Sequence, residues 1–199
     1  MYYKIVVPGS KPGTYSSCHG GRHTWTPGVT YGPVPVHPCY TGFHACRARD
    51  LSTWLVDGMV VFEVELTDVV EAHDKVVGST ATLGRCLGTI TREGMAEFAR
   101  RGSERANGYA ATAHAASYAV AAADAADAAA EAARAADYAA TAHAASYAVA
   151  AADAAEAAAE AAGGFGARYA AGSADYAARA AAARSEREQQ GRDILSLLG

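Results

Sequence analysis

Large apolar residues are concentrated in the first half of the chain and in its last few residues. They recur before Leu87, in short runs such as YYKIVV at residues 2–7, and they return in the closing DILSLLG. Alanine takes their place in between, and its methyl group buries far less apolar area than Leu or Ile. The pattern predicts an α+β protein, with a small, mainly β head that has one or two helices and a long alanine-rich helical tail.

Alternation predicts the strands of the head. In VVFEVEL at residues 60–66, Glu63 and Glu65 alternate with apolar residues, which is typical of a half-buried strand. Residues 2–7 are a β-branched run, and residues 73–90 offer two more short strands. Residues 28–36 are extended, but their prolines confine them to a sheet edge or a loop.

Helical spacing is found at two places before the tail. Leu51, Trp54 and Leu55 stand at i, i+3 and i+4, and Gly58 follows where such a one-faced helix would end. TREGMAEFARRGSERANG, at residues 91–108, predicts a connecting helix with Thr91 as its N-cap.

The tail contains a direct repeat. Residues 109–133 and 138–162 are identical except that Asp127 becomes Glu156, and 16 of the 25 residues in each copy are alanine. Alanine has the highest helix propensity, and residues 109–162 hold no Gly or Pro, so we expect helix. Unbroken, they would form a rod of about 80 Å. The sequence leaves open whether the helix is continuous or folds back between the copies.

These patterns divide the chain into three parts. We expect a mixed β head at residues 1–90, the connecting helix at residues 91–108, and the repeat tail at residues 109–199, with a turn at residues 163–166 (GGFG). After that turn a shorter helix would return, forming a hairpin.

One face of the repeat helix is suited to packing. The acidic residues share one stripe, and His114 and Tyr118 stand on the other side amid alanine. The copies are offset by close to eight helical turns, so His143 and Tyr147 repeat that face. Small residues let helices approach closely while rings fill the remaining gaps. We therefore expect these four residues to form an interface, and the protein to be a homo-oligomer.

Charge excludes some classes of partner. The net charge is −4, and residues 109–162 carry seven acidic side chains against Arg134 alone, which disfavours a protein that neutralises nucleic-acid phosphates. The first residues do not resemble a signal peptide, and the acidic residues make membrane insertion of the tail costly. We expect a soluble protein of the cytoplasm.

Four cysteines and seven histidines raise the question of a metal site. Zinc ligands usually occur as Cys-x(2–4)-Cys pairs, whereas the closest pair, Cys39 and Cys46, is separated by six residues. We therefore expect no metal and no cofactor, and interpret the cysteines as reduced thiols in the head.

Two short glycine-containing segments, residues 17–25 (SCHGGRHTW) and 38–46 (PCYTGFHAC), contain many of the cysteine, histidine and aromatic side chains of the head. Glycine permits backbone conformations that let side chains converge, and a cleft lined by His and Trp is a natural site for a small ligand or peptide. We expect one pocket or rigid turn cluster formed by Cys18, His19, Trp25, Gly42, Phe43 and His44.

The head resembles an uncharacterised domain found mostly in bacteriophage and actinobacterial proteins, in which a variable repetitive tail follows. The resemblance lies in the order of these two segments, the predicted helix around Trp54, VVFEVEL and Asp74-Lys75. The resemblance covers residues 3–85 and implies a phage or prophage setting without an established activity. The ATAH words and the ERE…ILSLL ending of the tail resemble alanine-rich immunity proteins.

The head also follows the coarse order of the ADP-ribosyltransferase fold. Gly42-Phe43-His44 precedes a helix and a long strand, and CHGG stands where that family keeps a His-Gly. The catalytic glutamate of that family has no clear counterpart, because Glu63 and Glu65 lie on the strand and Glu71 beyond it is freely placed. The chain also lacks a phosphate loop and a Gly-x-Ser-x-Gly motif.

We therefore expect no catalytic residues, and a phage-associated accessory protein that binds a host or phage macromolecule in the host cytoplasm. In this interpretation the helical tail serves self-association or partner capture. The alternative is a nucleotide-binding or ADP-ribosyltransferase-like head with the tail as an oligomerisation device.

Overall fold

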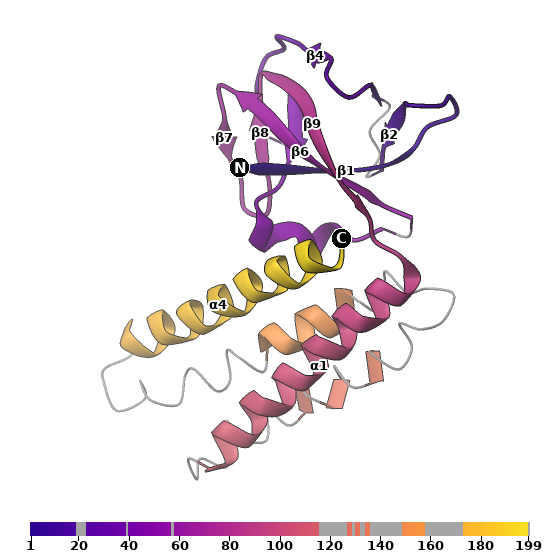
Figure 1. Ribbon diagram of the computed structural model, residues 1–199. Coiled ribbons are helices and arrows are strands. Elements are labelled where there is room, and N and C mark those ends of the chain that lie inside the picture. Colours follow the sequence, from indigo (N-terminus) through magenta and orange to yellow (C-terminus); the bar gives the residue numbers. More distant parts are fainter. Residues whose placement is uncertain are drawn as a thin grey trace. The chain divides into compact units, whose positions relative to one another are not determined.

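The computed structural model describes residues 1–18, 23–38, 40–56, 58–115, 127–128, 130–131, 134–135, 149–157 and 173–198 (Figure 1). The chain divides into two compact units. The β unit comprises Met1–Thr91 with Ile194–Gly199, and the helical unit comprises Arg92–Asp193. The last six residues therefore group with the β unit and not with the tail expected at residues 109–199.

The β unit is built on an antiparallel sheet in the order β3-β2-β1-β6-β9-β4. Its strands are β1 (Tyr2–Pro8), β2 (Tyr15–Ser17), β3 (Thr24–Trp25), β4 (Thr30–Tyr31), β6 (Val60–Thr67) and β9 (Thr80–Thr89). A smaller sheet has the order β5-β8-β7, with β5 (Phe43–Ala45), β8 (Val76–Gly78) and β7 (Val70–Glu71). The structure is thus a mainly β N-terminal region with helices, within the predicted α+β class.

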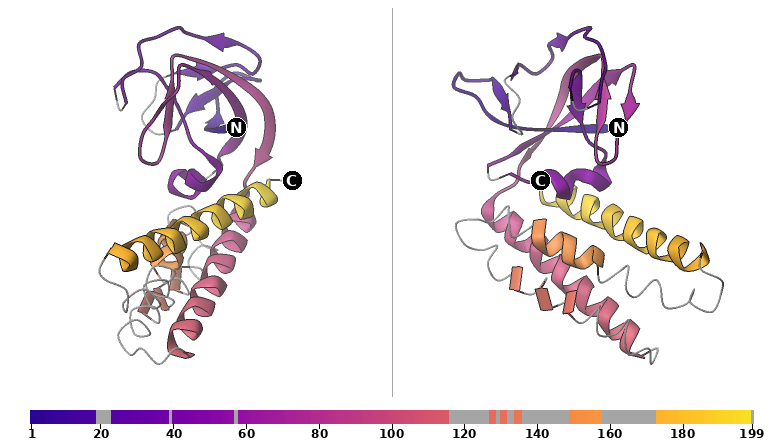
Figure 2. Two further views of the ribbon diagram at one scale, coloured as in Figure 1. Left: turned by 90° about the vertical axis from the view of Figure 1, so that its left-hand side faces the viewer. Right: turned by 180° about the vertical axis from the view of Figure 1, so that it is seen from behind.

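The strand predictions are confirmed in position. Within residues 28–36, strand pairing is confined to β4, which lies at the edge of the main sheet as the prolines of this segment require. Residues 73–90 form β8 and a ten-residue β9, which is longer than expected. Figure 2 shows that β9 is strongly curved. Its register with β6 shifts on both sides of Phe62, and bulges of this kind bend strands.

The bulge also explains where alternation fails. Val60, Val61 and Phe62 are all buried, whereas beyond Phe62 the strand returns to the predicted alternation of buried Val64 and exposed Glu65. The core of the β unit gathers around Phe62, with Val6, Trp25, Val64, Val76 and Leu83.

The tryptophan helix was predicted at the right place but with the wrong type. It is the 3-10 helix η1 (Ala48–Trp54), and Leu55 follows it in an extended conformation. Leu51 is fully buried as expected. Arg47, just before η1, bonds to Asp50 at 2.5 Å and also pairs with Glu71, so an ion pair fixes this short turn.

The helical unit contains α1 (Arg92–Ala115), a helical segment at residues 149–157, and most of α4 (Ser173–Leu197). α1 begins directly after Thr91 and runs through Gly108 into the first repeat copy. None of the described helices is long and apolar enough to cross a membrane.

The second repeat copy packs on α1. Ala154 and Ala155 form a small buried cluster with Ala106, joined by Tyr109. At Gly102 an added Cβ would lie 3.4 Å from the carbonyl oxygen of Ala151, so the backbones approach closely. In one straight helix, residue 155 would lie about 70 Å from Tyr109. The structure therefore excludes the continuous rod and agrees with a chain that folds back.

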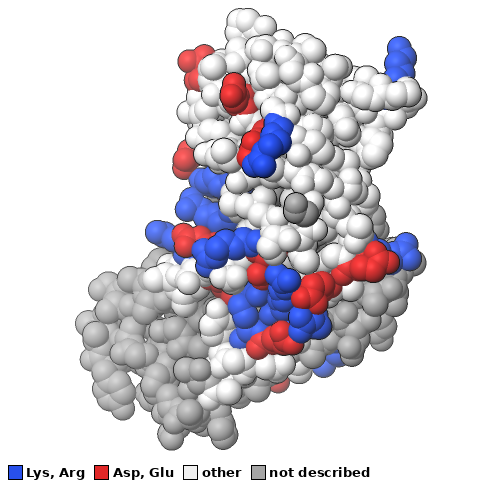
Figure 3. Space-filling model, viewed as in Figure 1, with Lys and Arg blue, Asp and Glu red and all other residues white. Residues whose placement is uncertain are grey.

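Polar contacts hold α4 in the helical unit. Glu186 is fully buried and accepts hydrogen bonds from Arg105 Nε at 2.9 Å and from the Tyr109 hydroxyl at 2.8 Å. Gln190 Nε2 donates to the carbonyl oxygen of Ala152 at 2.9 Å. Opposite charges are intermixed on the visible face of this unit (Figure 3). Hydrogen bonds and ion pairs thus supplement the small apolar area that alanine provides.

Of the predicted interface residues, His114 lies in α1, and Tyr118, His143 and Tyr147 lie outside the described residues. The end of the chain contributes to the β unit through Ile194 and Leu198, which are 0% and 8% exposed. Gly88, on β9 with φ +136°, has the carbonyl oxygen of Leu198 where a Cβ would stand. Glycine at this position therefore lets the chain end approach β9.

Candidate functional site

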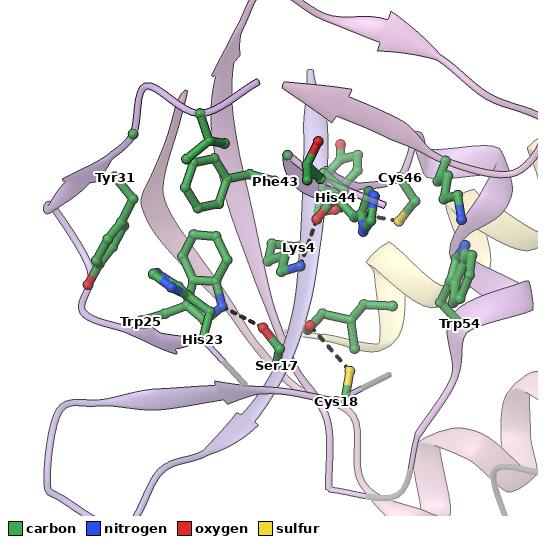
Figure 4. Close-up of a pocket in the computed structure, with 18 of the residues that line it drawn as sticks. Lys4, Ser17, Cys18, His23, Trp25, Tyr31, Phe43, His44, Cys46 and Trp54 are labelled. Atoms are coloured by element: carbon green, nitrogen blue, oxygen red, sulfur yellow. Dashed lines mark hydrogen bonds between the residues drawn. The ribbon is translucent and has the colours of Figure 1, made fainter. Parts of the chain in front are cut away.

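A cavity of about 720 Å³ opens in the β unit between β1, the β2–β3 ribbon and β5 (Figure 4). Five of the six residues that we expected to share a pocket line this cavity: Cys18, Trp25, Gly42, Phe43 and His44. The sixth, His19, lies outside the described residues. Sheet pairing explains their convergence. β1 pairs with β2, and an isolated bridge from Tyr3 to Cys46 brings the end of β5 beside β1.

Gly42 shapes the entry into β5. Its φ of +109° lies in a region that favours glycine, and an added Cβ would lie 2.5 Å from Val77 Cγ1 on the neighbouring strand. The glycine therefore allows the chain to turn closely against β8, so that Phe43 and His44 enter the cavity wall.

One end of the cavity is an aromatic cluster formed by His23, Trp25, Tyr31 and Phe43 (Figure 4). The His23 ring centroid lies 4.4 Å from that of Tyr31 and 4.5 Å from that of Trp25, both with edge-to-face geometry. Such pairs are favoured by the aromatic quadrupole. Trp25 Nε1 donates to Ser17 Oγ at 2.8 Å, so the indole is also fixed in orientation.

Sequence reasoning missed His23 and Tyr31. His23 stands two residues before Trp25 in the segment SCHGGRHTW, and residues two apart in a strand lie on the same face. This spacing could have identified His23. Tyr31 reaches the cluster only because β4 pairs with β9, a long-range pairing that local patterns do not reveal.

Lys4 lies between the aromatic cluster and His44. Its Nζ donates to the backbone oxygen of His44 at 2.7 Å and lies 5.1 Å from the centroid of the Trp25 ring. Burial lowers the pKa of the Lys4 ammonium to about 8, because the charged form loses hydration. A lysine within a β-branched strand usually points to solvent, and for this reason the sequence did not single it out.

Two imidazoles line the cavity with unpartnered nitrogens. Nε2 of His23 and Nε2 of His44 are buried and have no hydrogen-bond partner among the described residues. Burial lowers the pKa of both rings, and the charge of Lys4 lowers each further; Lys75 does the same for His44. Both rings are therefore neutral at neutral pH, and buried polar atoms of this kind normally have a partner.

The charged groups among the described residues that line the cavity are all basic. Lys4 and Lys75 contribute to it, and Lys75 Nζ stands 5.9 Å from the centroid of the Trp54 ring. Among the described lining residues there is no carboxylate. A low-dielectric cleft lined by one sign of charge concentrates ions of the opposite sign, here anions.

The two cysteines in the wall are thiols with low reactivity. Cys18 Sγ donates to the carbonyl oxygen of Ile5 at 3.3 Å, and Cys46 Sγ donates to that of Tyr3 at 3.5 Å. Burial raises the pKa of both thiols, that of Cys46 to about 12. Thiolate is the reactive form of cysteine, so these groups are poor nucleophiles. In the described part of the chain, no group of three His, Cys, Asp or Glu residues could hold a metal ion.

The glutamates considered as counterparts of the transferase base lie elsewhere. Glu63 accepts hydrogen bonds from Arg85 at 2.6 Å, and Glu71 accepts one from Arg47 at 2.9 Å. Neither these residues nor Glu65 line the cavity. Comparison with protein-family models, with curated proteins and with solved structures finds no match for this chain.

Proposed function

We propose that this is a binding protein whose β unit holds a small anionic ligand with a planar ring, of the nucleotide class. One observation carries the proposal: a single cavity combines the aromatic cluster, Lys4 and Lys75, and two imidazole nitrogens without a partner among the described residues. A ring packs favourably on the aromatic cluster, and an anionic group is attracted to the lysines.

Cavity size supports a ligand of this class. About 720 Å³ lies within the range of roughly 300–1,000 Å³ typical of small-molecule sites. Ligand sites are also mostly apolar, with a few placed polar groups that fix orientation. Here those groups are Lys4 Nζ and the two imidazoles, which lie on either side of it in Figure 4.

The lining favours binding over turnover. A general base or nucleophile needs a partner that activates it, and glycosyl transfer from NAD uses a carboxylate in that family's pattern. The described lining residues contain no carboxylate, and both cysteines are held as thiols. This supports the nucleotide-binding half of the alternative hypothesis more than its transferase half.

Calorimetry on the full chain with ATP, NAD and cyclic AMP tests the proposal. At least one ligand should bind, and Lys4→Met and Lys75→Met should each weaken it about tenfold, the value of one charge-assisted hydrogen bond. Lys11→Met is the matched control, because Lys11 is exposed and lies outside the cavity. If no ligand binds at millimolar concentration, or if Lys11→Met weakens binding equally, the proposal is wrong.

A second proposal concerns the helical unit, which we infer serves self-association or capture of a host or phage macromolecule in the host cytoplasm. The packing of Ala106 against Ala154 and Ala155 supports close contacts between alanine faces. That contact is made within one chain, so it does not itself require a second copy. The proposal therefore rests on Tyr118 and Tyr147, and light scattering of the variant with both changed to glutamate tests it. Dissociation supports self-association, and a wild-type monomer excludes self-association and leaves only partner capture.

A further inference from the structure

We propose that Lys4 forms a reversible imine with aldehyde or ketone ligands that carry a planar ring and an anionic group. The inference rests on the proposed function because it uses the same cavity. It adds a covalent step, and with it a chemical class for the ligand.

The position of Lys4 suits such a reaction. Its Nζ lies between the aromatic cluster and His44, and the hydrogen bond to the His44 backbone oxygen at 2.7 Å holds it there (Figure 4). No carboxylate of the described residues forms an ion pair with Lys4. A ring seated on Trp25 would place a substituent next to this amine, since the Nζ lies 5.1 Å from the indole centroid.

The surroundings of Lys4 favour the free amine. Only the neutral amine attacks a carbonyl carbon, and enzymes that use lysine in this way desolvate it in an apolar pocket. The desolvation described above leaves roughly one Lys4 side chain in ten neutral at pH 7. Lys11, in contrast, is exposed to solvent.

The reaction balances without an oxidant or reductant. The Nζ lone pair forms a bond to the carbonyl carbon, and a proton passes from nitrogen to oxygen to give a carbinolamine. The remaining proton on nitrogen then passes to the hydroxyl oxygen, the C–O bond breaks, water leaves, and the C=N bond forms. His23 and His44 line the same cavity as Lys4, and Nε2 of each ring has no hydrogen-bond partner among the described residues, so these rings are available to relay the proton.

Pyridoxal 5′-phosphate is a suitable probe because it combines a ring, a phosphate and an aldehyde. The full chain is incubated with the probe, reduced with cyanoborohydride, digested and mapped by mass spectrometry. Lys4, Lys11 and Lys75 are the three lysines of the chain, so the adducts can be assigned. We expect Lys4 to be modified about tenfold more than Lys11. Lys4→Arg should abolish that adduct, and Lys11→Arg should leave it unchanged.

Pyridoxine 5′-phosphate separates the two proposals, because it keeps the ring and phosphate but has an alcohol in place of the aldehyde. If it binds while the aldehyde modifies Lys4 no more than Lys11, Lys75 or the amine of Met1, the imine is excluded and the proposed function stands. If Lys4 is trapped selectively while neither pyridoxine 5′-phosphate nor any nucleotide binds, the imine stands and the anion site is wrong. Circular dichroism of Lys4→Arg shows whether that variant is folded. Protection of Lys4 by pyridoxine 5′-phosphate in the wild-type protein gives a readout that does not depend on the variant.

Discussion

Arg187 Nε donates to Glu156 Oε2 at 2.7 Å, and Glu156 is the one position at which the two repeat copies differ. Its counterpart in the first copy is Asp127, which is exposed. A glutamate carries one more methylene than an aspartate and so reaches further from the helix. The divergence of the copies thus coincides with a contact from the second copy to α4.

Restoring identity between the copies tests this relationship. Glu156→Asp should shorten the reach to Arg187 and lower the free energy of unfolding of the helical unit by about 0.5 kcal/mol, since the pair is only partly buried. Urea unfolding followed by circular dichroism measures the change. Asp127→Glu also makes the copies identical and should have no effect; an equal loss there would show that the ion pair is not the cause.

The buried carboxylate of Glu186 should contribute more. Glu186→Ala leaves Arg105 Nε and the Tyr109 hydroxyl without their acceptor in a buried site, while Arg105 Nη1 keeps its ion pair with Asp193. Breaking a buried pair in this way costs about 3 kcal/mol. The same unfolding measurement applies. Glu188→Ala is the matched control, because Glu188 is exposed on the same helix. Similar losses in both variants would show that helix propensity or net charge explains the effect.

Gly42 should tolerate no side chain. Gly42→Ala places a Cβ 2.5 Å from Val77 Cγ1 and adds strain at φ +109°, so we expect a loss of about 3 kcal/mol and weaker ligand binding. Gly13→Ala separates the two causes, because Gly13 has φ +72° but nothing within 4 Å of an added Cβ. It should cost about 1 kcal/mol. Thermal unfolding compares the variants, and equal losses would exclude the steric explanation.

The pH dependence of the free energy of unfolding should show the lowered pKa of Lys4. Its folded-state pKa of about 8 lies below its ordinary value, so the unfolded chain binds more protons between these values and stability rises with pH there. Below pH 8 the buried charge is fully unfavourable. Lys4→Met should therefore unfold at a higher temperature than the unmodified protein at pH 7, with a gain of at most about 3 kcal/mol less the lost hydrogen bond. The gain should shrink towards pH 10, and a gain independent of pH would contradict the shifted pKa.

Local sequence patterns predicted most strands of the β unit because alternation and proline placement are properties of short segments. They predicted η1 only in outline, since i, i+3, i+4 spacing does not distinguish a 3-10 turn from an α-helix. Lys4 was missed because its burial results from partners that are distant in sequence, such as His44 and Trp25. Alanine propensity predicted helix in the tail, but it contains no information on where the chain folds back.

Because residues 194–199 group with the β unit, the repeat lies inside an insertion and not in a terminal tail. Residues 92–193 form an insertion between two segments of one unit, entered after Thr91 and left at Ile194. The free energy of closing such a loop grows only with the logarithm of its length. Gain or loss of a repeat copy by recombination within the gene would thus lengthen or shorten the insertion while Thr91 and Ile194 keep their places. An array of this kind can vary in length during evolution without refolding the domain that carries it.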